Sequence, residues 1–117
     1  MSNNTIKNKS FDFAIRMVNS YKYLTSEKKE YVLSKQLLRS GTAIGALVRE
    51  SEHAESKADF IHKMSIALKE ANETEYWILL LYKTEYFDEK AFNSVIHDIT
   101  EILKLLTSII KTAKKNS

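Results

Sequence analysis

The sequence predicts an all-α fold, an up-down-up-down antiparallel four-helix bundle, and three observations point to it. The 117 residues contain no proline and only two glycines, whereas β-rich folds of this size need many turn residues. Apolar side chains recur with helical spacing in four segments. The breaks between the segments are short and polar, which favours antiparallel neighbours. A chain of this length forms one domain and leaves little room for a second.

The first helix is expected to begin after Ser10, a good N-cap, and to end near Leu24. We therefore expect a flexible N-terminal arm over residues 1–9, the bundle over residues 10–114 and a basic C-terminal tail over residues 115–117. At 100° per residue, the apolar side chains of this helix span roughly 200° of its circumference. An arc that wide predicts that the first helix is covered on more than one side.

The second helix is expected from about Ser26 to about His53. It contains Gly41 and Gly45, which are separated by three residues on one edge of its apolar stripe. Each glycine costs a helix about 1 kcal/mol relative to alanine, so a packing reason is expected. The spacing predicts close backbone contact with a neighbouring helix.

The third helix is expected to begin at Ser56, with Asp59 in the place of a capping-box acid, and to end near Glu85. Besides its core stripe it carries a second apolar flank, which a single small bundle has no means to bury. Acidic side chains lie beside this flank, and the pattern predicts a subunit interface. The predicted interface residues are Asp59, Ile66, Glu70, Glu73, Trp77 and Leu80.

The fourth helix is expected from about Glu89 to Ala113, with one apolar face and one polar face exposed to solvent. No secretory signal is visible at the N-terminus. The longest apolar run, residues 76–82, is seven residues long, far below the roughly 20 needed to span a bilayer. A cytoplasmic protein without membrane contact is expected.

A polar network is predicted between the second and third helices. With the turn near residues 54–55, Arg39 lies opposite Glu70 and Glu73 and on the same flank as Glu50. Arginine–carboxylate pairing at these positions would fix the register of the hairpin.

Few patterns point to chemistry. The pairs Glu50-x-x-His53 and Asp59-x-x-His62 have the spacing of di-iron bundle ligands, but they cluster at one turn, and the other helices offer no inward carboxylate at that level. There is no cysteine, phosphate-binding loop or nucleophile elbow. We expect no catalytic residue, no metal, no cofactor and no small-molecule substrate.

Charge is unevenly distributed along the chain. Residues 1–39 carry eight Lys or Arg against three acids, residues 40–101 carry six against twelve, and residues 102–117 carry four lysines and no acid. Basic ends around an acidic middle could face an anionic partner, or oppositely charged helices could simply lie side by side. The predicted nucleic-acid-binding residues are Lys7, Lys9, Lys28, Lys29, Lys111, Lys114 and Lys115.

The run from Gln36 to Gly45, followed by Glu50, Ser56, residues 59–60, 67–71, 73–74 and 76–77, resembles the 23S ribosomal RNA intervening-sequence proteins. The resemblance extends from the residues around Ser10 to the lysine-rich tail. It implies a four-helix bundle that assembles as a ring-like homopentamer, and it supplies no catalytic residues. Members are often encoded within insertions in ribosomal RNA genes, and the accessory variability proteins of retroelements are distant relatives. One departure is Ala46 to Arg49, where the family usually has an Asn and a small residue.

Residues and resemblance together predict a non-enzymatic homo-oligomer, expected to be a pentamer, that binds RNA, a ribosome or another ribonucleoprotein through basic surfaces. We expect RNA to bind at the end of the ring that carries both termini. The alternative is a protein-interaction scaffold that does not bind nucleic acid.

Overall fold

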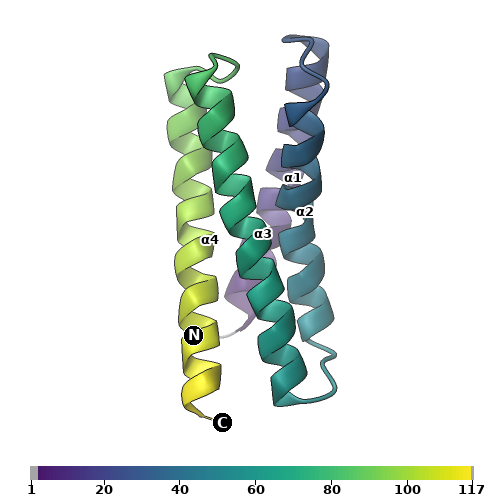
Figure 1. Ribbon diagram of the computed structural model, residues 1–117, viewed down its shortest axis with the longest axis vertical. Coiled ribbons are helices and arrows are strands. Elements are labelled where there is room, and N and C mark those ends of the chain that lie inside the picture. The colour runs from purple at the N-terminus through teal and green to yellow at the C-terminus, as the bar shows by residue number, and fades with distance from the viewer. Residues whose placement is uncertain (1–2, 117) are drawn as a thin grey trace.

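The computed structural model describes residues 3–116, which form four antiparallel helices in an elongated bundle of 47 × 21 × 19 Å (Figure 1). The helices are α1 (Asn3–Ser26), α2 (Leu33–Ser51), α3 (Lys57–Lys83) and α4 (Glu89–Lys115). The predicted fold class is confirmed. Within the described residues, no helix combines the length and the apolar character needed to cross a membrane.

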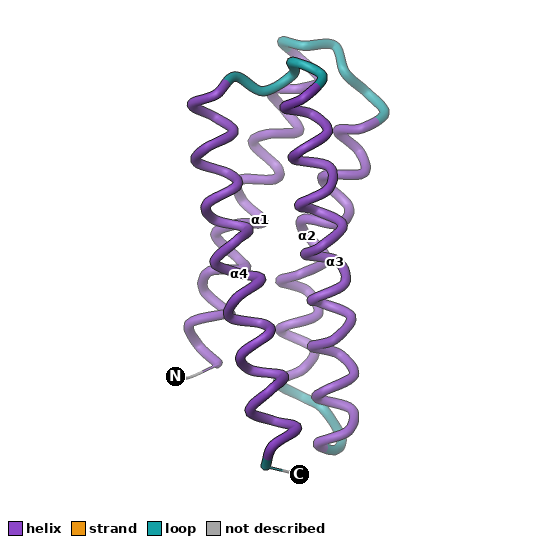
Figure 2. Tube along the Cα trace, turned by 60° about the vertical axis from the view of Figure 1, so that its left-hand side comes forward, coloured by secondary structure: helices purple, strands orange, loops and turns teal. Residues whose placement is uncertain are grey.

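Each helix packs along its chain neighbours, whereas α1 and α4 approach each other less closely. The α1–α2 and α3–α4 connections lie at one end of the bundle and the α2–α3 connection at the other (Figure 2). The backbones of α1 and α3 do not approach each other closely in the described chain, so these helices lie on one diagonal of the bundle and α2 and α4 on the other. The outward faces of α1 and α3 therefore point away from each other.

The start of α1 corrects the expected N-terminal arm. Residues 3–9 are helical, and Ile6 and Ser10 are both fully buried. Ser10 is not an N-cap, because its hydroxyl donates to the carbonyl of Lys7 within the helix. Ile6 lies seven residues before the buried Phe13 and extends the core stripe by two turns, and this burial favours helix over a free arm. Residues 1–2 of the predicted arm lie outside the described residues.

The connection between α1 and α2 also differs from the prediction, because α2 begins at Leu33 and not near Ser26. α1 ends at Ser26, and Lys29 in the connection adopts a positive φ of 54°, which a helix does not allow. The buried carboxylate of Glu30 then accepts hydrogen bonds from the backbone N–H groups of Leu33 and Ser34, at 3.0 and 2.7 Å. Glu30 thus caps the first turn of α2.

The starts of α3 and α4 follow from their caps. Ser56 accepts a hydrogen bond from the backbone N–H of Asp59 at 3.0 Å, as the sequence predicts, and Asp88 accepts one from Ala91 at 2.8 Å. The helix α4 continues to Lys115, so the predicted tail begins inside the last helical turn. Ser117 lies outside the described residues.

The two glycines bring α1 and α2 close together, as their spacing predicts. A Cβ atom at Gly45 would lie 3.2 Å from the backbone oxygen of Ser10. A Cβ atom at Gly41 would overlap the buried side chain of Met17, with its Sδ at 2.6 Å. Larger residues would force the two helices apart.

Candidate functional site

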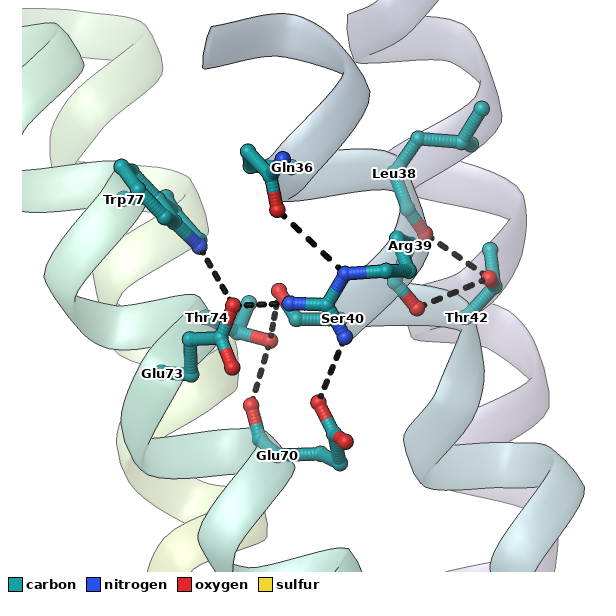
Figure 3. A network of polar contacts seen from close by, with 9 residues as sticks. All are labelled: Gln36, Leu38, Arg39, Ser40, Thr42, Glu70, Glu73, Thr74 and Trp77. Carbon is teal, nitrogen blue, oxygen red and sulfur yellow. Dashed lines mark hydrogen bonds and ion pairs between the residues drawn. The ribbon is translucent and has the colours of Figure 1, made fainter.

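The guanidinium of Arg39 bridges α2 to two carboxylates of α3 (Figure 3). Its Nη1 donates to Glu70 at 3.2 Å, and its Nη2 forms an ion pair with Glu73. The expected facing positions are therefore in contact. Because Arg39 is half-exposed, solvent screens this network, and its main effect is to set the hairpin register.

Three further hydrogen bonds extend this network, and sequence reasoning did not predict them. The indole Nε1 of Trp77 donates to Glu73 at 3.0 Å, and Nε of Arg39 donates to Gln36 at 3.3 Å. Behind them, the buried hydroxyl of Thr74 donates to Ser40 at 2.9 Å (Figure 3). Glu73 therefore holds both the guanidinium and the indole, which orients Trp77 on the flank of α3.

Glu50 does not belong to this network, which corrects the prediction. It shares a flank with Arg39 on the helical wheel, but it lies eleven residues later and hence about 16 Å along the helix axis. Its exposed carboxylate makes no hydrogen bond or ion pair within the described residues. Two side chains on the same flank of a helix do not meet when they lie this far apart along its axis.

The predicted interface on α3 is partly occupied by contacts within the chain. Ile66, Trp77 and Leu80 are all half-buried. Asp59 accepts hydrogen bonds from the backbone N–H of Glu55 at 3.1 Å and from Lys63 at 3.2 Å. The Glu55 N–H and then the Lys63 ammonium lower the pKa of Asp59. Asp59 therefore stabilises the start of α3 through contacts within the chain.

The most exposed apolar side chains of α3 are neighbours of the predicted ones. Tyr76 is 58% exposed and Leu79 is 40% exposed. The ring of Tyr76 meets Trp77 edge-on, with centroids 5.1 Å apart. The α3 face, defined here as Tyr76, Leu79 and Leu80 with the edge of Trp77, is thus an aromatic and aliphatic surface turned to solvent.

A second uncovered apolar surface lies on α1. Phe11 is 51% exposed, Ile15 is 47% exposed and Val18 is 39% exposed. These three residues, the α1 face, follow one another at helical spacing on one side of the helix. The guanidinium of Arg49 covers part of Phe11, at 5.2 Å from its ring centroid. The wide apolar arc in the sequence indicated this surface, but none of its residues was predicted as interface.

Two of the predicted RNA-binding lysines are held in ion pairs. Lys7 pairs with Glu52 at 3.3 Å, and Lys9 pairs with Glu101 of α4 at 3.1 Å. The hydrogen bond from Lys9, followed by its charge, lowers the pKa of Glu101. The basic start of the chain is therefore neutralised in part by acids from the middle segment, and its lysines are less available than predicted.

The other predicted lysines divide between the two ends of the bundle. Both termini lie at one end (Figure 1), together with the exposed side chains of Lys111, Lys114 and Lys115. Lys28 and Lys29 are exposed in the α1–α2 connection at the opposite end. Three of the seven predicted lysines therefore lie within two turns of α4 at the end that carries the termini, and Lys114 among them has a contact within the chain.

The seam between α1 and α4 contains a shallow hollow and the one candidate cation site of the described residues. The hollow, of about 220 Å³, lies beside Asp98 and Glu101, whose oxygens come within 4.8 Å of a His97 nitrogen. Arg16 donates to Asp98 at 2.6 Å, and Lys9 already pairs with Glu101. These carboxylates therefore have cationic partners and form cross-helix ion pairs. His53 and His62, the histidines of the two carboxylate-x-x-histidine pairs, are exposed.

Comparison with known proteins identifies a family and a similar solved structure. The family model described as 23S rRNA-intervening sequence protein matches residues 2–108. A solved structure from Bacteroides thetaiotaomicron, described as a protein with unknown function from the S23 ribosomal protein family, is 60% identical and superposes with a TM-score of 0.93. The match covers 95% of this chain and 99% of that chain. No curated protein matches this chain.

Proposed function

Because the chain belongs to the 23S rRNA-intervening sequence protein family, we propose that it acts as a non-enzymatic homo-oligomer that binds RNA or a ribonucleoprotein through basic surfaces. We expect five subunits, as the family resemblance implies. The observation that carries the proposal is the pair of uncovered apolar surfaces on α1 and α3, which one copy cannot bury.

The positions of these two surfaces favour a ring. They differ in composition, and they lie on opposite sides of the bundle because α1 and α3 are diagonal helices. A heterologous contact joins two different surfaces head to tail and closes into a ring when the rotation allows it. In this arrangement the α1 face of each subunit packs on the α3 face of the next one.

Light scattering at micromolar concentration tests the assembly. We expect one species of five times 13.5 kDa. A species of 13.5 kDa at all concentrations would contradict the assembly.

RNA binding is tested separately, by titrating a structured RNA against the protein at increasing salt. Phosphate contacts release counterions, so binding should weaken steeply as salt rises. The exposed lysines support this expectation, as does the rRNA in the family's description. An assembly that binds no RNA at low salt would favour the alternative, an interaction scaffold without nucleic-acid binding.

A further inference from the structure

A stripe of basic side chains follows the outer face of α4. Lys90, His97, Lys104 and Lys111 are spaced seven residues apart, and Lys115 follows four residues later. Seven residues make nearly two helical turns, so these side chains stand above one another at steps of about 10.5 Å. All five are exposed. We call these five residues the α4 stripe.

The α4 stripe is only partly compensated within the chain, where Glu101 lies 3.6 Å from His97 and is also affected by the charge of Lys104. Lys90, Lys104, Lys111 and Lys115 make no ion pair with any described residue. The neighbouring acids of α4 are already engaged, because Asp98 accepts from Arg16 and Glu101 from Lys9. The cross-helix pairs of α1 therefore leave much of the positive charge of α4, above all that of Lys90, Lys111 and Lys115, available to a ligand.

The surroundings of the stripe fit a phosphate backbone better than a protein surface. Among the described residues of α4, no large apolar side chain is exposed, in contrast to α1 and α3. Exposed hydroxyl groups of Thr107, Ser108 and Thr112 lie between and beside the lysines. The one aromatic residue of α4, Phe92, stacks on Tyr82 with centroids 3.9 Å apart. It is therefore engaged within the bundle.

We propose that the α4 stripe binds the phosphate backbone of double-stranded RNA. This inference rests on the proposed function and moves its RNA-binding surface from the end that carries the termini to the side of the bundle. Single-stranded RNA is bound largely by stacking of bases on exposed aromatic rings, which the α4 surface does not offer. A duplex presents phosphates and 2′-hydroxyls on a rigid surface, which lysines and hydroxyls can contact without reading sequence.

The geometry of the helix suits this ligand. The 27 residues of α4 form a straight rod of about 40 Å, so its cations are held at fixed spacings along a duplex. One stripe offers few contacts, and a single subunit binds weakly. Five stripes in one ring would act together, because each contact after the first is intramolecular.

The experiment compares two double variants with the same change in net charge. Lys104→Glu/Lys111→Glu alters the stripe, and Lys22→Glu/Lys35→Glu alters exposed lysines near the far end that make no ion pair and are not among the predicted RNA-binding residues. Binding to a labelled RNA duplex of about 20 base pairs is measured by anisotropy from about 50 to about 200 mM salt. The stripe variant should lose roughly tenfold or more in affinity and show a shallower salt slope, while the control changes by less than about twofold.

Three further measurements make the result decisive. Lys104→Arg/Lys111→Arg should retain binding, and the mass and helical circular dichroism of every variant should match the parent. Single-stranded RNA and a DNA duplex of the same sequence should bind more weakly than the RNA duplex. If the stripe variant and the control lose the same affinity, the α4 stripe is not the RNA-binding surface. If single-stranded RNA or the DNA duplex binds as tightly as the RNA duplex, the ligand is not specifically double-stranded RNA. If the parent protein binds no RNA, the proposed function fails at its first step.

Discussion

The outer faces of α1 and α4 differ although both helices rest on the same core. Each contributes fully buried side chains, such as Phe13 from α1 and Leu106 from α4. On the outside, α1 exposes four large apolar or aromatic side chains, whereas α4 exposes lysines and hydroxyls. The core therefore determines the fold, and the residues opposite the core determine what each helix can contact.

The two seams of α1 show a related difference. On the α2 side, Gly41 and Gly45 allow the backbones to approach closely. On the α4 side, the contact depends on ion pairs from Lys9 and Arg16 beside a shallow hollow. Substitutions on α1 should therefore have effects that depend on which side of the helix they face.

A charge placed in the α1 face tests most directly whether the outer faces of α1 and α4 have different roles. We expect Ile15→Glu to reduce the assembly to monomers, because an unpaired carboxylate would be buried at the contact. Sedimentation would measure the loss of mass, and circular dichroism should show an intact bundle because Ile15 is outside the core. As the matched control, Lys104→Glu on α4 should leave the mass unchanged. An Ile15→Glu protein that keeps its full mass would show that the α1 face is not an interface.

The network that supports the α3 face gives the next largest effect. We expect Arg39→Ala to lower the free energy of unfolding by about 1–2 kcal/mol, since it leaves Glu70 and Glu73 without their cation. Urea unfolding of the single variants and of Arg39→Ala/Glu73→Ala gives the coupling energy. If the effects of the two single substitutions simply add up in the double variant, Arg39 and Glu73 are not coupled, and the network is contradicted.

The close seam of α1 can be tested at Gly41. An added methyl group gains about 1 kcal/mol of helix propensity but overpacks Met17, which costs about 1–3 kcal/mol. We expect Gly41→Ala to be destabilising by roughly 1 kcal/mol in thermal or urea unfolding. A more stable protein would mean that Met17 moves aside freely.

The smallest effect concerns the end of the bundle where α1 turns into α2. Burial raises the pKa of Glu30, but hydrogen bonds from the backbone of Leu33, Ser34 and Val32 outweigh it, so the pKa is lowered. A lowered pKa stabilises the folded state above the unfolded-state pKa, and this contribution is lost as pH falls through the folded-state pKa. As the pH is lowered, the free energy of unfolding of Glu30→Gln should therefore fall less steeply than that of the parent protein. Identical acid profiles would exclude a stabilising role for the charge.

The sequence predicted the bundle and much of its hairpin for physical reasons. The apolar periods of α3 and α4 and the cap at Ser56 are local signals, and the facing of Arg39 and Glu73 follows from one short turn. The predicted start of α1 was wrong. Ser10 is a residue type that often caps a helix, but α1 extends before it because Ile6 is buried in the tertiary structure.

The functional surfaces were harder to predict. The spacing of the α4 lysines is visible in the sequence, but which lysines are free depends on contacts between distant segments. In the sequence, Lys104 is the expected partner of Glu101 because it follows three residues later on the same helix, and only the fold shows that Lys9 forms the ion pair with Glu101.

Mixing two variants tests the central claim, that the α1 face of one copy packs on the α3 face of the next. Ile15→Glu blocks the first face, and Tyr76→Glu blocks the second without removing the bond between Trp77 and Glu73. Each variant alone should be monomeric, and an equimolar mixture should form a 1:1 dimer and nothing larger, measured by native mass spectrometry. A mixture that stays monomeric, or either variant dimerising alone, would contradict the head-to-tail assembly.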